Sequence, residues 1–323
     1  MKTIIPSITL ALTIGIGVLS PPVHGHFSAA AHPMPKQAPG YYKWTLGDFA
    51  ITSLSDGTLD MPVEELLHGP GPGEVAASFK AAFAELPMEM SVNAFLIDTG
   101  TQLILVDTGG GILYGPSLGR VRENLFAAGY RPEQVDLVLL THIHGDHSGG
   151  LLIEGKPVFP NAKVRGAKAD LDHFTDPGEQ KAATKLTEVN FSAAKAVSSA
   201  YGAAGQLVPF AEGGEIVPGV SALLAPGHSP GHTVYVIESK GQKLMLLGDL
   251  VHVPQIQFAH PDYAMVFDYD KGEGQIVRKT FLQDAAAQRQ WIAGAHLPFP
   301  GIGHIRAEGA GYTYVPAEYS ANR

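Results

Sequence analysis

The sequence predicts an α/β fold in which β-sheets carry helices on their outer faces. Segments that read as β-hairpins alternate with amphipathic helices along most of the 323 residues. No stretch reads as an interdomain linker, and no internal repeat occurs at the period of a solenoid. With 45% hydrophobic residues, the chain can bury the core of one large domain or of two small ones.

Residues 1–30 are predicted to be a secretory signal peptide and leader. Lys2 precedes an apolar run from Ile8 to Leu19, which is short for a full membrane span, and a proline pair with small residues follows it. Cleavage there would leave no stable membrane anchor. The remaining domain, residues 31–323, would then be periplasmic or secreted.

Composition narrows the partners and ligands of this domain. The net charge is −9 and no run of basic residues occurs, which argues against a nucleic-acid partner and favours a small-molecule substrate. The chain has no cysteine, so it can form neither disulfides nor thiolate ligands. Any metal site must therefore use His, Asp or Glu side chains.

The N-terminal half of the domain reads as strands, a hairpin and one helix. Residues 41–63 alternate like strands around an SDG turn at 55–57, and a loop rich in glycine and proline follows. Residues 93–111 read as a hairpin that turns at Thr99–Thr101 and ends in a glycine-rich loop. Residues 118–130 fit a helix ending at Gly129, and 135–142 fit a buried strand. The predicted apolar face of that helix contains Leu118, Val121, Leu125 and Phe126.

The C-terminal half repeats this alternation. Residues 181–205 are helical in composition, and three apolar strands are predicted in GVSALLAPG, TVYVIES and KLMLLGDL. Lys240–Gln242 would form the turn between the last two. Residues 275–290 then read as a helix, and WIAGAH (291–296) reads as a short strand.

The segment THIHGDHSGG (141–150) is the strongest chemical signal in the chain. His142 and His144 alternate, so they can share one face at the end of the preceding strand. After Gly145 the chain turns, and Asp146 and His147 can face a second point. An H-x-H-x-D-H pattern would arise by chance about once in a thousand such chains. The pattern therefore indicates ligands for two adjacent metal ions.

Three later segments place further ligands directly after apolar strands. APGHSPGHT (225–233) carries His228 and His232, and WIAGAHLPFPGIGH (291–304) carries His296 and His304. In LLGDL, Asp249 follows a strand where a carboxylate is unfavourable unless it is hydrogen-bonded or bound to a cation, and its two oxygens could bridge two metals. Strand ends gathered at one sheet edge are where ligand-binding loops lie.

These motifs, in this order, resemble the metallo-β-lactamase superfamily. Residues 38–58 and 299–316 add a likeness to methyl parathion hydrolase and its lactonase-like relatives within it. The resemblance implies an αββα sandwich of two mixed β-sheets with helices on the outer faces, and a homodimer. It also implies that His142, His144 and His228 hold one metal, that Asp146, His147 and His296 hold the other, and that Asp249 bridges them.

The same resemblance suggests supporting residues and one departure. Asp107 and Thr141 match positions that orient a ligand histidine, while His232 and His304 match positions near the site that are not ligands. Gly145 lies between the expected ligands His144 and Asp146, where the methyl parathion hydrolase that the chain resembles has proline. Glycine is looser there, so metal affinity or site geometry could be relaxed.

The expected chemistry is binuclear hydrolysis. Two divalent ions that share a water lower its pKa, and the resulting hydroxide would attack an organophosphate triester, a lactone or an aryl ester. Asp249 and Asp146, which would hold the ions, are the expected catalytic carboxylates. Zn²⁺ suits such a ligand set, with Mn²⁺, Co²⁺ and Fe²⁺ as alternatives. Expected apolar pocket walls are Phe95, Phe174, Phe191 and Phe258.

Three other functions compete with this interpretation. A β-lactamase-type hydrolase of the same fold is disfavoured because some such enzymes need cysteine and others lack the aspartate of GDL. A mononuclear iron dioxygenase acting on sulfur compounds would not need the second ligand set, which includes His147 and His296. A non-enzymatic metal protein would be expected to saturate its metal with protein ligands rather than divide them between two open sites.

Overall fold

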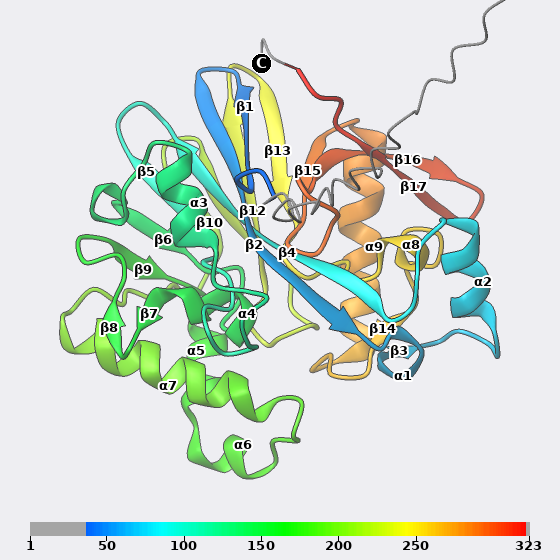
Figure 1. The fold of residues 1–323 in the computed structure, drawn as a ribbon, viewed down its shortest axis with the longest axis horizontal. Helices are drawn as coiled ribbons and strands as arrows, with labels where there is room; N and C mark the ends of the chain where they lie inside the picture. Colours follow the sequence, from blue (N-terminus) through cyan, green and yellow to red (C-terminus); the bar gives the residue numbers. More distant parts are fainter. Residues whose placement is uncertain (1–36, 321–323) are drawn as a thin grey trace, which may run out of the picture. The chain divides into compact units, whose positions relative to one another are not determined.

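Two mixed β-sheets pack face to face in the computed structural model, which describes residues 37–320 (Figure 1). The predicted signal peptide and leader, residues 1–30, lies outside the described residues. The first sheet has six strands in the order β1-β2-β4-β5-β6-β9, and the second has seven in the order β10-β11-β12-β13-β15-β16-β17. The predicted αββα sandwich is confirmed.

The strands of both sheets are mostly antiparallel, with parallel pairing at β5/β6/β9 and at β13/β15. In the first sheet they are β1 (Tyr41–Leu46), β2 (Phe49–Met61), β4 (Met88–Asp98), β5 (Leu103–Val106), β6 (Leu137–Leu139) and β9 (Lys163–Arg165). In the second they are β10 (Gly214–Val217), β11 (Val220–Leu224), β12 (Thr233–Ser239), β13 (Gln242–Leu246), β15 (Trp291–Ala293), β16 (Ile302–Glu308) and β17 (Gly311–Pro316).

Helices cover the outer face of each sheet. Figure 1 shows α3 (Val121–Ala127), α5 (Lys168–Thr175) and α7 (Glu188–Ala203) on one side of the paired sheets and α9 (Lys271–Ala287) on the other. None of the described helices is long and apolar enough to cross a membrane. The remaining short elements are α1 (Val63–Leu66), β3 (Leu67–His68), α2 (Glu74–Ala81), η1 (Pro132–Gln134), α4 (Gly145–Ser148), η2 (Gly149–Leu151), β7 (Leu152–Ile153), β8 (Lys156–Pro157), α6 (Pro177–Lys181), α8 (Pro254–Gln257) and β14 (Ala264–Met265).

The alternation of side chains along the strands produces three apolar layers. In β4, Phe95 and Ile97 point into the layer between the sheets, while Ala94 and Leu96 point outward to the helices of the first sheet. In the second sheet, alternate residues of β12 and β13 divide in the same way between the central layer and the layer under α9. Both faces of each sheet are therefore buried, which fits the apolar runs in the sequence.

The structure corrects three details of the predicted elements. Residues 55–57 (SDG) are not a turn but a β-bulge inside β2, because the Asp56 carboxylate points inward and accepts from the backbone N–H groups of Gly110 and Val121. Phe126 is exposed on α3 and does not share its buried face. The helix predicted over 181–205 begins only at Glu188.

Four segments of the metal motif emerge at one edge of this sandwich. Residues 142–147 follow β6, His228 follows β11, Asp249 follows β13 and His296 follows β15. Strands β11, β13 and β15 run in the same direction, so their carboxyl ends meet at the same edge of the second sheet. The ends of strands from both sheets therefore bring the ligands together at one edge of the sandwich.

Candidate metal centre

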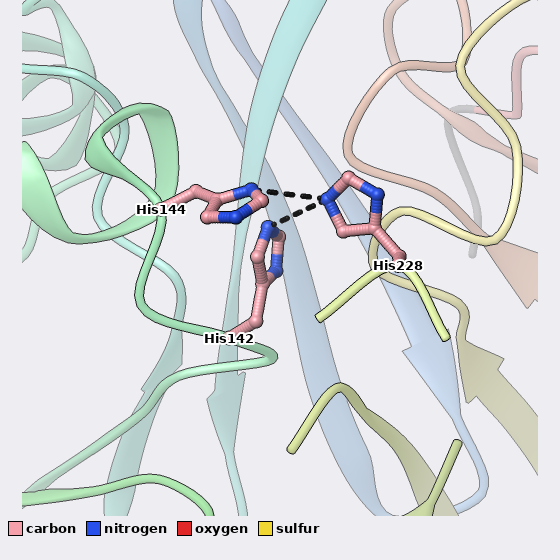
Figure 2. Close-up of side chains that lie close together, drawn as sticks. All are labelled: His142, His144 and His228. Carbon is pink, nitrogen blue, oxygen red and sulfur yellow. Dashed lines mark hydrogen bonds between the residues drawn. The ribbon is translucent and has the colours of Figure 1, made fainter. Parts of the chain in front are cut away.

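Three histidines from both sheets form the first group of candidate ligands, here called the three-histidine group (Figure 2). His228 Nε2 lies 3.2 Å from His142 Nε2 and 3.0 Å from His144 Nδ1. Ligand nitrogens about 2.0–2.1 Å from a tetrahedral Zn²⁺ would be about 3.3 Å apart. The three nitrogens thus have nearly the spacing that a single ion requires.

The second group, here called the carboxylate group, consists of Asp146, His147, Asp249 and His296, whose ligand atoms lie within 4.8 Å of one another. His147 Nε2 is 3.1 Å from Asp249 Oδ1, and His296 Nε2 is 3.1 Å from Asp249 Oδ2. Asp146 Oδ2 lies 3.6 Å from His147 Nε2 and 3.5 Å from His296 Nε2. All seven residues predicted as ligands are therefore brought together in these two groups.

Asp249 reaches both groups at once. Its Oδ2 atom lies 3.3 Å from His228 Nε2 and 3.6 Å from His142 Nε2, while its Oδ1 faces His147. The carboxylate is 2% exposed and its backbone N–H donates to His232 Nε2 at 2.9 Å. One side chain between two ligand groups is the arrangement that a bridging ligand requires.

The buried ligand atoms of the two groups are better suited to binding cations than to hydrogen bonding with one another. His147 Nε2 and Asp249 Oδ1 are buried without a hydrogen-bond partner among the described residues, although buried polar atoms are normally paired. Six ligand side chains are almost fully buried, and such a concentration of imidazole and carboxylate is unfavourable unless a charge compensates it. Bound divalent cations would satisfy both unpartnered atoms.

The outward ring nitrogens of the ligand histidines are fixed by acceptors. The Nδ1–H of His147 donates to Asp107 at 2.9 Å, and that of His228 donates to Asp268 at 2.8 Å. The Nδ1–H of His296 donates to the backbone carbonyl of Ser91. These bonds fix which nitrogen faces the centre and raise its basicity toward a metal.

Two buried aspartates connect the segments that carry the ligands. Asp107, in the left-handed conformation at φ 59°, also accepts from the backbone N–H and hydroxyl of Thr141. Asp170 on α5 accepts from the N–H groups of Ile143 and Gly231 and from the Ser229 hydroxyl. Asp170 therefore ties the loop of His142 and His144 to the loop of His228.

The two groups differ in their electrostatics. Burial lowers the pKa of His142 and of His144 well below the ordinary value, and neighbouring imidazoles lower it further. Burial also acts to lower the pKa of His147 and His296, but the carboxylates around Asp249 outweigh it and raise the pKa of both. For Asp249, burial acts to raise the pKa, but the surrounding histidines hold it well below its usual range.

His232 and His304 have different environments. His232 is fully buried beside the site, where its Nδ1–H donates to the Ala225 carbonyl and its Nε2 accepts from the Asp249 backbone. Burial lowers the pKa of His232 to about 3, so it stays neutral in this role. His304, expected near the site, instead lies by Trp291 at the start of β15, the end remote from His296, and contacts the Gln290 carbonyl.

Sequence reasoning missed His252. Its Nε2 lies 3.0 Å from Asp249 Oδ2, and it forms a third possible ligand group with His228 and Asp249. The spacing GDLVH, with a histidine three residues after the bridging aspartate, was the available signal. Sequence reasoning also missed Asp268, which lies in an irregular segment 40 residues from His228 with no motif to mark it.

Two cavities open onto the ligands. One, of about 230 Å³, is lined by His144 and His228 together with Phe174, Phe191, Phe267 and Tyr269. The other, of about 140 Å³, is lined by Asp146, Asp249 and His252 together with Leu59, Met61, Met90, Tyr114, Leu186 and Phe267. Two of the expected wall residues, Phe174 and Phe191, do line a cavity. Phe95 and Phe258 belong instead to the central and outer apolar layers.

Comparison with known proteins identifies the superfamily of this chain. The family model described as the metallo-beta-lactamase superfamily matches residues 88–302. The crystal structure of hydrolase AbOPH, in the beta lactamase superfamily, has a TM-score of 0.83 at 35% identity and covers 88% of this chain and 100% of that one. AidC, a dizinc quorum-quenching lactonase in complex with its product, has a TM-score of 0.80 at 28% identity, with coverages of 87% and 98%.

Among curated proteins, an N-acyl homoserine lactonase of Bacillus cereus is 28% identical over 179 residues. That match covers 50% of this chain and 63% of the lactonase. The chain thus spans somewhat less than two thirds of the length of this relative.

Proposed function

The chain belongs to the metallo-β-lactamase superfamily, and we propose that it is a two-metal hydrolase that opens lactones and cleaves aryl esters with apolar substituents. The observation that carries this proposal is the position of Asp249. It lies between the three-histidine group and the carboxylate group and also lines the smaller cavity. A carboxylate placed between two ligand groups and beside a cavity is typical of binuclear hydrolases.

The donor set supports two divalent ions, with Zn²⁺ the best match. The three-histidine group offers only nitrogens, and the carboxylate group offers two nitrogens and carboxylate oxygens, which borderline-soft metals accept. Two such ions would supply a water of lowered pKa and a Lewis acid for the substrate oxygen. Asp249 would contribute to holding both ions. The histidines beside it are fixed in turn, because Asp107 orients His147 and Asp268 orients His228.

Asp146 has a second role in this proposal. Its side chain is 16% exposed and faces the smaller cavity, whereas Asp249 is buried. A carboxylate at the boundary between ligands and cavity can accept the proton of the attacking water and deliver it to the leaving oxygen. The exposure of Asp146 and the burial of Asp249 support general acid–base transfer by Asp146 and ion bridging by Asp249.

The cavity walls favour neutral, apolar substrates. Phe174, Phe191 and Phe267 offer aromatic surface, and leucines and methionines line the smaller cavity. No Lys or Arg is among the described residues that line either cavity. Phosphomonoesters and other anionic substrates would thus find no lysine or arginine to pair with in these walls, while the lactonase relatives support lactones with an acyl substituent.

We extend the proposal to neutral organophosphate triesters and to secretion. A triester presents a phosphoryl oxygen and apolar groups to the same centre, and the sequence resembles methyl parathion hydrolase in its N-terminal and C-terminal segments. Secretion rests on the apolar pattern within residues 1–30.

A hydrolysis panel on zinc-loaded and manganese-loaded protein tests this function. The panel contains an acyl-homoserine lactone, an aromatic lactone, a phenyl ester, an aryl phosphotriester and a cephalosporin. We expect kcat/KM for the lactones and the phenyl ester to exceed that for the cephalosporin by at least about 100-fold, which corresponds to roughly 2.7 kcal/mol of transition-state stabilisation. Preferred turnover of the cephalosporin, or one iron per chain with no hydrolysis, would overturn the proposal.

A further inference from the structure

Tyr114 stands at the metal centre without belonging to either ligand group. It lies on the glycine-rich loop after β5 and lines the 140 Å³ cavity together with Asp146 and Asp249. Neither the predicted ligand set nor the supporting carboxylates account for a tyrosine at this place. A polar hydroxyl is thus presented to a cavity whose other walls are largely apolar.

The hydroxyl of Tyr114 has only a weak protein partner. It lies 3.4 Å from Asn190 Oδ1, whereas O–H···O hydrogen bonds are normally 2.5–3.0 Å long. Asn190, on α7, lines the same cavity and is buried. The hydroxyl proton of Tyr114 therefore remains available to an acceptor that enters the cavity.

Gly145 fixes this arrangement from the ligand loop. Its N–H donates to the same Asn190 Oδ1 at 3.0 Å. A Cβ atom at position 145 would come within 2.9 Å of the Tyr114 hydroxyl and 3.2 Å of its ring. Proline would add that bulk and also remove the N–H. Gly145, which stands where the resembling relative has proline, thus leaves room for Tyr114 over the ligand loop.

The surroundings keep the phenol in its donor form. Burial, and after it the negative charges of Asp146 and Asp249, raise the pKa of Tyr114 well above its ordinary value. A phenol keeps its proton at neutral pH, so the Tyr114 hydroxyl can donate a hydrogen bond to an acceptor in the cavity. Such a donor gains strength as negative charge develops on its acceptor.

We propose that Tyr114 is a further catalytic residue, whose hydroxyl donates a hydrogen bond to the oxygen of the substrate's carbonyl or phosphoryl group as that oxygen becomes negatively charged. Asn190 lies beside the phenol oxygen, and Gly145 leaves the ring the room that it occupies. No bond is made or broken by Tyr114, and the proton stays on its oxygen. This proposal rests on the proposed hydrolase function, because it needs a substrate with such an oxygen.

The first test compares Tyr114→Phe with Tyr130→Phe. Tyr130 is a matched control, because its hydroxyl also has a single 3.4 Å contact, to Asp98 Oδ2, and it lines neither cavity. We expect Tyr114→Phe to lower kcat by about 10–100-fold on the preferred lactone, with little change in KM. Metal content and Tm should stay those of the wild type. Tyr130→Phe should keep kcat within about twofold.

Two further measurements separate a substrate contact from a structural effect. A phosphonate analogue of the tetrahedral intermediate should bind Tyr114→Phe more weakly by about the same factor as the loss in kcat. Gly145→Ala should lower kcat by displacing the phenol, and its effect should shrink to about twofold or less in the Tyr114→Phe background. Gly145 lies between two ligands, so metal content is measured in every variant.

The outcomes distinguish this proposal from the one on which it rests. Wild-type kcat in Tyr114→Phe, additive losses in the double variant, or a loss that follows metal content would each overturn the role of Tyr114. A wild-type protein that hydrolyses nothing in the panel would instead overturn the hydrolase function itself.

Discussion

The three-histidine group and the carboxylate group lie side by side, but they are built from different chemistry. His142, His144 and His228 present only ring nitrogens, and burial lowers the pKa of the first two well below the ordinary value. The carboxylate group contains Asp146 and Asp249, and these charges raise the pKa of His147 and His296 despite their burial.

This difference determines what a cation must displace in each group. Because burial lowers the pKa of His142 and of His144, these two imidazoles are neutral at neutral pH, so a metal can bind their ring nitrogens without displacing a proton. In the carboxylate group, protons on the histidines balance the carboxylates until a cation replaces them. One fold can therefore place the three-histidine group beside the carboxylate group, whose metal occupancy we expect to depend on pH, with Asp249 in contact with both.

Replacement of Asp249 should have the largest effect, because this residue contacts both groups. For Asp249→Ala we expect a loss of activity of at least about 1,000-fold and metal content well below that of the wild type. Activity on the preferred lactone and elemental analysis of the same sample measure both effects. A variant that kept both metals, or full activity, would show that the carboxylate does not bridge the groups.

Single histidine replacements sharpen the comparison, because each should affect its own group. His228→Ala removes a nitrogen from the three-histidine group, and His296→Ala removes one from the carboxylate group. We expect each variant to retain about one metal per chain and to lose activity by roughly 100- to 1,000-fold. His304→Ala, on β16 away from the centre, is the control with wild-type metal content. Loss of both metals from either variant would mean that the groups do not bind independently.

The sequence predicted the ligand-bearing part of this centre because its ligands occur directly after apolar strands. His142, His228, Asp249 and His296 each follow a strand that the hydrophobic pattern identifies, and parallel strand directions bring those ends to one edge. All four segments also contain glycine or proline, which limit the conformations of the loops that carry the ligands. Strand ends and short motifs are local features, so a sequence can display them.

The supporting residues were harder to predict because tertiary contacts alone define them. Asp268 reaches His228 from an irregular segment after β14, and no periodicity marks it. Asp56 looked like part of a turn because its SDG context is typical of one, but its hydrogen bonds from the glycine-rich loop and from the start of α3 outweighed that local preference. The burial of Phe95 in the central layer rather than in a cavity depends likewise on how the two sheets pack.

The orienting carboxylates should give a smaller effect that again separates the groups. Asp107→Asn would weaken the hydrogen bond to His147, and Asp268→Asn would weaken the bond to His228. We expect each variant to lose about 10- to 100-fold in affinity for the metal of its own group only. Competition with a chromophoric chelator measures both affinities. Equal weakening of both sites in either variant would contradict the separate support of the two groups.

The pH dependence of metal binding, which needs no substitution, addresses the comparison most directly. A histidine with a raised pKa keeps its proton at neutral pH, so a metal must displace that proton, and affinity falls as pH falls. His147 and His296 have raised pKa values, so affinity at the carboxylate group should fall by about tenfold per pH unit for each proton displaced. For His142 and His144 the pKa is lowered, so both imidazoles are neutral between about pH 6 and 8 and their affinity for a metal should change little over that range.

Calorimetric titration of the metal-free protein can count these protons. Titrations in buffers of different ionisation enthalpy should show more proton release when the carboxylate group is filled than when the three-histidine group is filled. In His296→Ala, which lacks one of the two histidines of raised pKa, the proton release should decrease while metal binding at the three-histidine group is unaffected. Equal proton release at both sites would mean that the carboxylates do not distinguish the groups, and the electrostatic basis of the comparison would be lost.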